Sequence, residues 1–297
     1  MPASAPPSKP AAGGSLDRPR ASVLIGAYRD TVALAVLLGA LVDQTEPPDE
    51  VVIAEDGACP EVARFVAEQK GLPFTLLHTS GPDTGWTKNT SLNRAIRASS
   101  GELLLFLDED CPPFPGWVAA HRALAAPGRV LCGRRVDVGP GFSARLRSGE
   151  LSAAALAKGY LRRYRALAKD GGRHLEEGLA VPAGGALGRW TARWRKKVWL
   201  VGCNWSCQRA DLLAINGFDE DFDEPCYGED IDLERRFRLL GLEVLSARNL
   251  APVFHLDHAK RFDQGARDRM QAVMASRPDS PRCLNGIQDE RVLAPTP

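Results

Sequence analysis

The sequence lacks any long apolar run, and no stretch approaches the roughly 18 consecutive apolar residues of a membrane-spanning helix. Its start also lacks the layout of a secretory signal peptide, in which positive charge precedes an apolar segment. Lys and Arg total 38 against 37 Asp and Glu, so no excess of positive charge indicates nucleic-acid binding. These absences predict a cytoplasmic protein with no nucleic-acid partner.

The chain also lacks a disulfide pattern. Its seven cysteines are an odd number scattered through 297 residues. Cys203 and Cys207 have no second pair that would complete a zinc-binding spacing, so we expect them to be small buried thiols. With 44% hydrophobic and 25% charged residues, the composition is that of an ordinary globular chain.

Residues 1–19 are rich in Pro, Ala, Ser and Gly, and we expect a disordered tail there. From Ala21 onward, short apolar runs alternate with segments whose apolar residues have helical spacing. This alternation predicts βαβ units with right-handed crossovers and a mostly parallel sheet. The expected strands are 22–27, 50–54, 74–77 and 103–108, with helices beginning near Thr31, around Val62 and over 89–99.

Polar groups follow three of these strands, and ligands of open α/β sheets bind at the carboxyl ends of strands. No GxGxxG follows the first strand, so a mononucleotide is a better ligand than a dinucleotide. Each group has a simpler explanation, such as a turn or a solvated helix start, but their recurrence at matching strand ends favours a site. The groups are Ala27, Tyr28 and Arg29, then Glu55 and Asp56, then Asp108 and Asp110, joined by Lys88 and Asn89 at a helix start.

Asp108 and Asp110 stand two residues apart after the most apolar strand, and the prolines that follow stop the sheet ladder. Paired carboxylates suit Mg²⁺ or Mn²⁺ shared with the phosphates of a substrate. Near the end of the chain, His255 and His258 follow an apolar stretch. A lone His is more often structural, but imidazole suits Mn²⁺, and either residue could complete the metal site.

A second acidic pair, Glu229 and Asp230, begins a helix predicted over 231–240. An ordinary amphipathic helix also begins with acids, because the helix dipole favours them there. Gly228 before the pair would let a ligand approach the backbone, which favours a functional role. The other elements expected in this half are a helix over 117–125, strands over 129–138 and 198–203, and a short helix over 211–215.

Several of these motifs together resemble the inverting, GT-A-fold glycosyltransferases of family 2. They are VLIGAYRD from Val23, VVIAEDG from Val51, the span 85–110 with GELLLFLDED, and NGFDEDF with GEDIDLERR. The resemblance covers about Ser22 to His258, and the block 201–242 is also similar to the C-terminal catalytic segment of β1,4-galactosyltransferases. Glu55 stands where the family usually has Asp, and Lys88 where Arg is common.

The resemblance implies a GT-A-type, Rossmann-like, mostly parallel sheet flanked by helices, with a C-terminal acceptor-side region. It further implies a nucleotide-sugar donor, with UDP the expected nucleotide, a Mn²⁺ or Mg²⁺ cofactor, and inversion at the anomeric carbon. In this reading residues 20–138 bind the donor, 201–262 hold the acceptor and the catalytic groups, and 263–297 form a C-terminal tail.

The same resemblance implies a role for each candidate residue. Asp230 is the general base and Glu229 orients the acceptor. The metal ligands are Asp108 and Asp110 with His255 or His258. The donor-binding residues are Ala27, Tyr28, Arg29, Glu55, Asp56, Lys88, Asn89 and Asp108.

Two rival functions share these features. A nucleotidyltransferase that makes a nucleotide sugar would need a Gly-rich basic loop after the first strand, and Gly26 to Arg29 is too sparse for one. A non-catalytic subunit that only binds nucleotide sugars would not need the second acidic pair.

The insert 139–200 is basic, with 13 Lys or Arg against 4 Asp or Glu between residues 141 and 200. Trp190, Trp194 and Trp199 surround the cluster Arg195 to Lys197, and Arg162 to Arg165 forms a second cluster. This pattern is compatible with peripheral contact to an anionic membrane at its inner face, with a groove for an anionic acceptor, or with a solvated helical insert. The expected acceptor is a glycan or a lipid-linked molecule.

Overall fold

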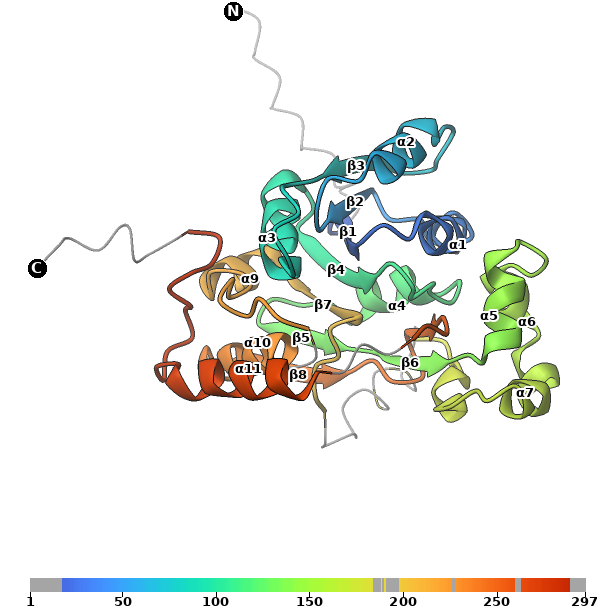
Figure 1. Cartoon of the computed structure of the whole chain (residues 1–297). Coiled ribbons are helices and arrows are strands. Elements are labelled where there is room, and N and C mark those ends of the chain that lie inside the picture. Colours follow the sequence, from blue (N-terminus) through green and yellow to red (C-terminus); the bar gives the residue numbers. More distant parts are fainter. Residues whose placement is uncertain are drawn as a thin grey trace, which may run out of the picture.

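The structure, a computed structural model, describes residues 18–183, 188, 190, 198–225, 228–259 and 263–288. Its centre is a seven-stranded sheet with the strand order β3-β2-β1-β4-β7-β5-β8 (Figure 1). The first four strands are parallel, as the alternating pattern predicts, because a helix crosses over after each of the first three. These elements are β1 (Ala21–Ala27), α1 (Thr31–Val42), β2 (Glu50–Glu55), α2 (Pro60–Glu68), β3 (Thr75–Thr79), α3 (Lys88–Ala98) and β4 (Leu103–Asp108).

The second half extends this sheet and adds a smaller one. Strand β7 runs antiparallel to both β4 and β5, and β5 is parallel to β8. Strands β6 and β9 form a separate parallel pair. The elements are α4 (Trp117–Leu124), β5 (Arg129–Cys132), β6 (Arg134–Asp137), β7 (Asn204–Gln208), α9 (Arg209–Ala214), α10 (Glu229–Leu239), β8 (Glu243–Ser246) and β9 (Pro252–His255).

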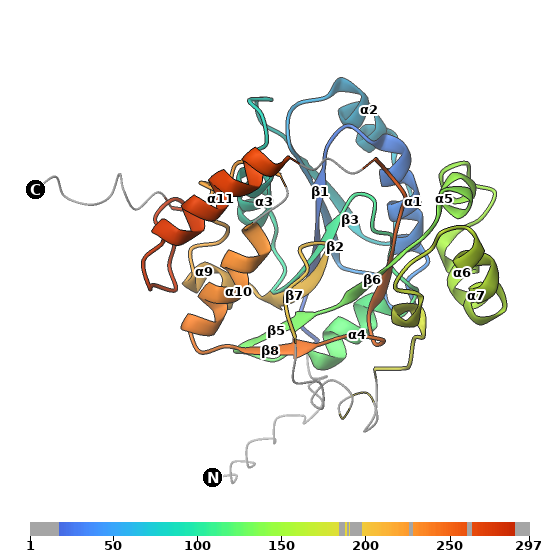
Figure 2. The same ribbon diagram turned by 60° about the horizontal axis from the view of Figure 1, so that its bottom comes forward.

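Helices cover both faces of the large sheet, as expected for the GT-A-type α/β class. Side chains alternate along β1, so that Val23 and Ile25 pack with α1, α2 and α4. Leu24 packs on the opposite face with α3, α9 and α10. On that second face Phe106 of β4 stacks on Trp205 of β7, with ring centroids 4.1 Å apart. The two layers are visible in Figure 2.

Two strand predictions are wrong. The segment 129–138 is not one strand, because the chain leaves the large sheet at Gly133 and enters the small one. A Cβ atom at Gly133 would lie 2.2 Å from the Asn204 side chain, so the close approach requires glycine. The segment 198–203 is not a strand either, and the strand is Asn204–Gln208.

The polar residues of β7 explain the second error. Asn204 and Ser206 are fully buried, which an apolar pattern cannot predict. The side-chain oxygen Oδ1 of Asn204 accepts a hydrogen bond from Trp117 Nε1 at 2.8 Å, and Ser206 Oγ lies 2.7 Å from His121 Nδ1. Long-range partners therefore satisfy these side chains within the core. Cys203 and Cys207 are buried free thiols, as predicted.

The basic insert contains α5 (Pro140–Arg147), α6 (Ala153–Lys158), α7 (Tyr160–Lys169) and the 3₁₀ turn η1 (Leu175–Gly178). These elements build a third apolar cluster against α1, β6 and β9, and both views place them beyond α1. Trp194 and Arg195 to Lys197 lie outside the described residues, so membrane contact stays a prediction. No helix in the described part of the chain combines the length and apolarity needed to cross a lipid bilayer.

The segment 263–297, expected as a C-terminal tail, contains a helix, α11 (Gln264–Ser276), within its described residues 263–288. Only Ala266 and Met270 of this helix are buried, which explains why its apolar pattern is weak. Ion pairs fix its end, because Arg277 lies 2.8 Å from both Asp219 and Asp221. Residues 1–17 of the expected N-terminal tail lie outside the described residues.

Candidate active site

The ends of β2, β1 and β4 meet at one edge of the sheet, as the sequence predicts. The register of the parallel strands places Ala27 beside Glu55 and Gly26 beside Asp108. Because neighbouring parallel strands end at the same edge, the polar residues that follow them gather there. The predicted donor-binding segments are thus brought together.

Hydrogen bonds and an ion pair join the loops at this edge. The Tyr28 backbone N–H donates to Glu109 Oε2 at 2.9 Å, and Arg29 pairs with Asp83. Asp56 accepts a hydrogen bond from the Thr87 backbone N–H at 2.9 Å. The loops after β1, β2 and β4 and the start of α3 therefore form one connected wall, which can hold a nucleotide.

Two predicted donor-binding side chains are engaged within the protein. Glu55 is buried and accepts a hydrogen bond from the Cys59 backbone at 2.6 Å, and its other oxygen lies 2.7 Å from His78 Nε2. Asn89 is also buried, and its amide donates to the carbonyl of Asp219 at 2.8 Å. Both shape the wall of the site and have their polar atoms occupied.

Lys88 connects the donor side of the site to the second acidic pair. Its Nζ atom lies 2.9 Å from Asp108 Oδ1 and 3.5 Å from Glu229 Oε1. Burial lowers the pKa of Lys88, but the carboxylates of Asp108 and Glu229 outweigh it and hold that pKa above its ordinary value. Lys88 is therefore a fixed positive charge between α3, β4 and α10.

Asp110, His255 and His258 form a compact cluster. Asp110 Oδ2 lies 3.3 Å from His255 Nε2 and 3.1 Å from His258 Nε2. Burial would raise the pKa of Asp110, but hydrogen bonds from the two imidazoles lower it well below the ordinary range. Burial likewise opposes charge on His255, yet the neighbouring carboxylates of Asp110 and Asp137 raise its pKa to about 9.

This cluster fits a divalent metal. One carboxylate oxygen and two imidazole nitrogens lie within 4.8 Å of one another, and this donor set suits Mn²⁺. Both predicted histidines belong to the cluster. Asp108, also predicted as a ligand, is not part of this cluster, and its Oδ1 atom lies 2.9 Å from Lys88 Nζ.

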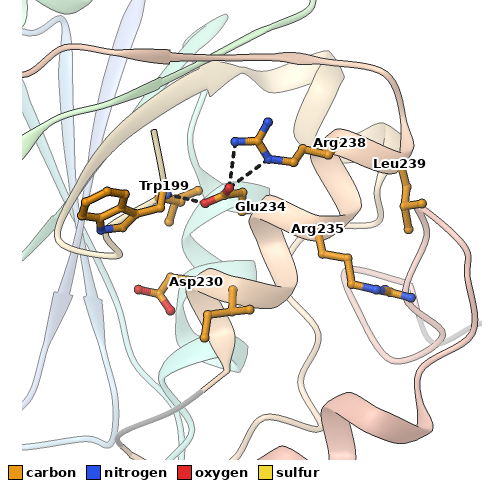
Figure 3. Close-up of a pocket in the computed structure, with 8 residues that line it drawn as sticks. Trp199, Asp230, Glu234, Arg235, Arg238 and Leu239 are labelled. Carbon is orange, nitrogen blue, oxygen red and sulfur yellow. Dashed lines mark hydrogen bonds and ion pairs between the residues drawn. The ribbon is translucent and has the colours of Figure 1, made fainter. Parts of the chain in front are cut away.

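Asp230 faces a cavity of about 790 Å³ beside α10 (Figure 3). Glu229 and Asp230 are adjacent on the helix, so their side chains point in different directions, and Glu229 turns to Lys88. Burial raises the pKa of Asp230, and the positive charge of Lys88 opposes that rise. The cavity is lined by Trp199, Leu200, Asp230, Ile231, Glu234, Arg235, Arg238 and Leu239.

The walls of this cavity are rigidly held. Glu234 accepts hydrogen bonds from the Leu200 backbone at 2.6 Å and from Arg238 Nε at 2.9 Å. The Arg134 guanidinium lies 4.1 Å from the centroid of the Trp199 ring, which is a cation–π contact. Trp199 is nevertheless 56% exposed, so it offers apolar surface to a ligand.

Sequence reasoning missed two groups at the site. Glu109 lies between the two aspartates, and burial with the neighbouring carboxylates raises its pKa to about 8 while it anchors Tyr28. Its position within the motif could have indicated this role. Asp137 lies 3.3 Å from His255 Nδ1. No motif marks it, because the contact follows from the pairing of β6 with β9.

We expect Lys88→Met to destabilise the protein in a pH-dependent way. Removing the ammonium leaves Asp108 and Glu229 facing each other, which should cost about 3 kcal/mol of unfolding free energy near neutral pH. The pKa of Glu229, already raised by burial, would rise further. The penalty should therefore shrink as the pH falls and Glu229 takes up a proton.

Urea denaturation at about pH 8 and about pH 5 measures this difference, with Lys70→Met as the control at an exposed lysine. A loss of stability equal at both pH values, or no larger than that of the control, would contradict the bridging role of Lys88.

The family model described as "Glycosyl transferase family 2" matches residues 22–180 of this chain. Validoxylamine A glucosyltransferase of Streptomyces hygroscopicus subsp. limoneus is 29% identical over 249 residues, which are 80% of this chain and 52% of that protein. Chondroitin synthase of Escherichia coli is 29% identical over 106 residues, 35% of this chain and 15% of that protein. The chain thus spans about half, or less, of the length of these relatives.

Two solved structures share the fold. The mannosyltransferase PcManGT of Pyrobaculum calidifontis, in complex with GDP-Man and Mn²⁺, matches with a TM-score of 0.50 and 18% identity over 82% of this chain and 59% of that chain. GalNAc-T7, with UDP, GalNAc and Mn²⁺, matches with a TM-score of 0.56 and 12% identity. The match covers 83% of this chain and 45% of that chain. These likenesses confirm the predicted fold class.

Proposed function

We propose, because the chain belongs to glycosyl transferase family 2, that it transfers a sugar from a nucleotide-sugar donor to a hydroxyl group of a glycan or lipid-linked acceptor. The observation that carries this proposal is the ion pair of Lys88 with both Asp108 and Glu229. These contacts bring the end of β4 close to the start of α10, where Asp230 lines its cavity, and this supports a donor site beside an acceptor site. A protein that only binds a nucleotide sugar would not need this second carboxylate.

On the donor side, the loops after β1 and β2 would hold the nucleotide. Asp56 and the backbone around Tyr28 would bind the base, with UDP the expected nucleotide, and Asp108 would meet the ribose. Lys88 would act as a point charge toward the diphosphate, since an ammonium lacks the bidentate geometry of arginine. The two solved structures of similar fold contain GDP-Man and UDP, which supports the proposal that a nucleotide binds at this edge of the sheet.

Asp110, His255 and His258 would hold the metal, Mn²⁺ or Mg²⁺. Two imidazole ligands favour Mn²⁺ of the two, because Mg²⁺ prefers oxygen ligands. When bound, the ion would neutralise negative charge on the nucleoside diphosphate as it leaves. Both solved relatives contain Mn²⁺, which supports this assignment.

Asp230 would be the general base. A hydroxyl group in the cavity loses its proton to the Asp230 carboxylate as its oxygen attacks the anomeric carbon, and the bond to the diphosphate breaks on the opposite side. A single displacement of this kind inverts the anomeric configuration. The role follows the resemblance to β1,4-galactosyltransferases that was inferred from the sequence for the block 201–242. Glu229 would hold Lys88 in place, which is a different task from the acceptor orientation predicted for it.

The acceptor would bind along the cavity beside α10. Trp199 offers an exposed aromatic surface on which an apolar sugar face can pack, with Ile231 and Leu239 further along. This arrangement favours an acceptor that extends away from the donor along the helix.

We expect Asp230→Asn to lower kcat by about 10²-fold or more while leaving donor affinity unchanged, because the amide cannot accept the proton. Since burial raises the pKa of Asp230, activity should be lost on acidification at a higher pH than for an ordinary aspartate. Steady-state kinetics and calorimetric donor titration measure the two effects, and Asp223→Asn, at an exposed carboxylate of the preceding loop, is the control. Turnover within a few-fold of wild type would remove Asp230 from the role of base.

We expect Asp110→Ala to abolish Mn²⁺-dependent donor binding without unfolding the protein. Asp110 is the carboxylate that both histidines contact, so its loss removes the only anionic ligand of the cluster. Calorimetric titration of UDP-sugars and GDP-sugars with and without Mn²⁺ tests this, and Asp257→Asn, two residues after His255, is the control. Equal Mn²⁺-dependent affinity in wild type and Asp110→Ala would refute the metal assignment.

A further inference from the structure

The pairing of β6 with β9 places a carboxylate beside one of the cluster histidines. In the parallel register of these strands, Asp137 stands directly opposite His255. The Val138 backbone N–H donates to the His255 carbonyl at 3.1 Å, which fixes that register beyond the end of β6. Asp137 Oδ1 consequently lies 3.3 Å from His255 Nδ1, while Nε2 of the same ring faces Asp110.

The Asp137 side chain is not needed to hold its own segment in place. Its backbone already exchanges two hydrogen bonds with Arg173, at 3.1 and 2.9 Å, which tie β6 to the part of the insert between α7 and η1. The carboxylate is anchored by Arg173 at 3.0 Å on Oδ2 and by Arg135 at 3.3 Å on Oδ1. Arg173 thus pairs with the oxygen that does not face His255, whereas Arg135 and the imidazole share Oδ1.

Asp137 Oδ1 is buried, yet no hydrogen bond of good geometry satisfies it within the described residues. Its nearest polar neighbours are Arg135 Nε and His255 Nδ1, both at 3.3 Å. A buried acceptor without a well-formed bond is costly, so a small rotation of the imidazole toward it would be favourable. That rotation would complete an Nδ1–H bond to Asp137 and leave Nε2 free.

We propose that Asp137 is a positioning residue that fixes the tautomer and orientation of His255, so that Nε2 is presented to a divalent cation together with Asp110 and His258. The inference rests on the proposed metal site. A histidine that binds a metal through one nitrogen commonly donates its other N–H to a carboxylate, and loss of such a partner weakens metal binding by about 10- to 100-fold. Through Asp137, the insert would also support the metal site.

The test is a titration of the full chain with Mn²⁺ alone, in which the free ion is followed by electron paramagnetic resonance. Asp137→Asn keeps the size of the side chain and removes its charge, and we expect its Kd for Mn²⁺ to rise about 10- to 100-fold. The matched control is Arg173→Ala, which removes the partner of the other carboxylate oxygen. Because the Arg173 side chain is 57% exposed, we expect a change of about fivefold or less.

A second variant and a second measurement separate positioning from folding. Asp137→Glu keeps the charge that Arg135 and Arg173 contact but moves the carboxylate, so it should remain folded and still bind Mn²⁺ more weakly than wild type. The melting temperature of each metal-free variant is recorded alongside. A purely structural role would lower the melting temperature of Asp137→Asn and Arg173→Ala alike, with similar effects on Mn²⁺ affinity, and that result would overturn the proposal.

Asp110→Ala in the same titration distinguishes the two levels of failure. If it abolishes Mn²⁺ binding while Asp137→Asn and Asp137→Glu bind as wild type does, the inference about Asp137 is wrong and the metal site stands. If Asp110→Ala binds Mn²⁺ like wild type, or wild type binds none, the metal site itself is wrong and the inference falls with it.

Discussion

The Lys88 ammonium lies between the carboxylate of Asp108 at the end of β4 and that of Glu229 at the start of α10. It belongs to α3, so the consecutive elements α3 and β4 meet the distant helix α10 at one charge. A charge with little access to water is costly without a partner, so the mostly buried Lys88 and Glu229 stabilise each other, and the more exposed Asp108 adds a second partner for Lys88. The ion pairs therefore fix where the end of β4 stands relative to Asp230 and its cavity.

A second set of contacts surrounds Asp110. His255 comes from β9 and Asp137 from β6, so the small parallel sheet carries one of the two histidines that meet the Asp110 carboxylate. The helices of the insert pack against that sheet through a shared apolar cluster that also includes α1. The insert therefore supports the strands that carry His255 and Asp137.

The first half of the fold could be predicted because its strands are apolar and its helices show a clear apolar period of about 3.6 residues. The candidate site residues there could be predicted because they follow the strand ends.

Strand β7 could not be predicted from the sequence. Its buried Asn204 and Ser206 depend on hydrogen bonds with Trp117 and His121, which only the folded chain brings near. Helix α11 could not be predicted either, because it buries few apolar side chains and ion pairs such as that of Arg277 with Asp219 hold its end. The position of Asp137 next to His255 could not be predicted either, because it follows from the register between β6 and β9. Ligand chemistry and family resemblance grouped Asp110 with His255 or His258, and the folded chain brings both histidines to that carboxylate.

The most direct test of the central claim is the release of nucleoside diphosphate from a panel of nucleotide sugars by the full chain, with Mn²⁺ and with a chelator. The account predicts that at least one donor is cleaved, that chelation stops the reaction, and that the released sugar has the anomeric configuration opposite to that of the donor. Release that is insensitive to the chelator, a sugar with retained configuration, or no release from any donor would contradict it.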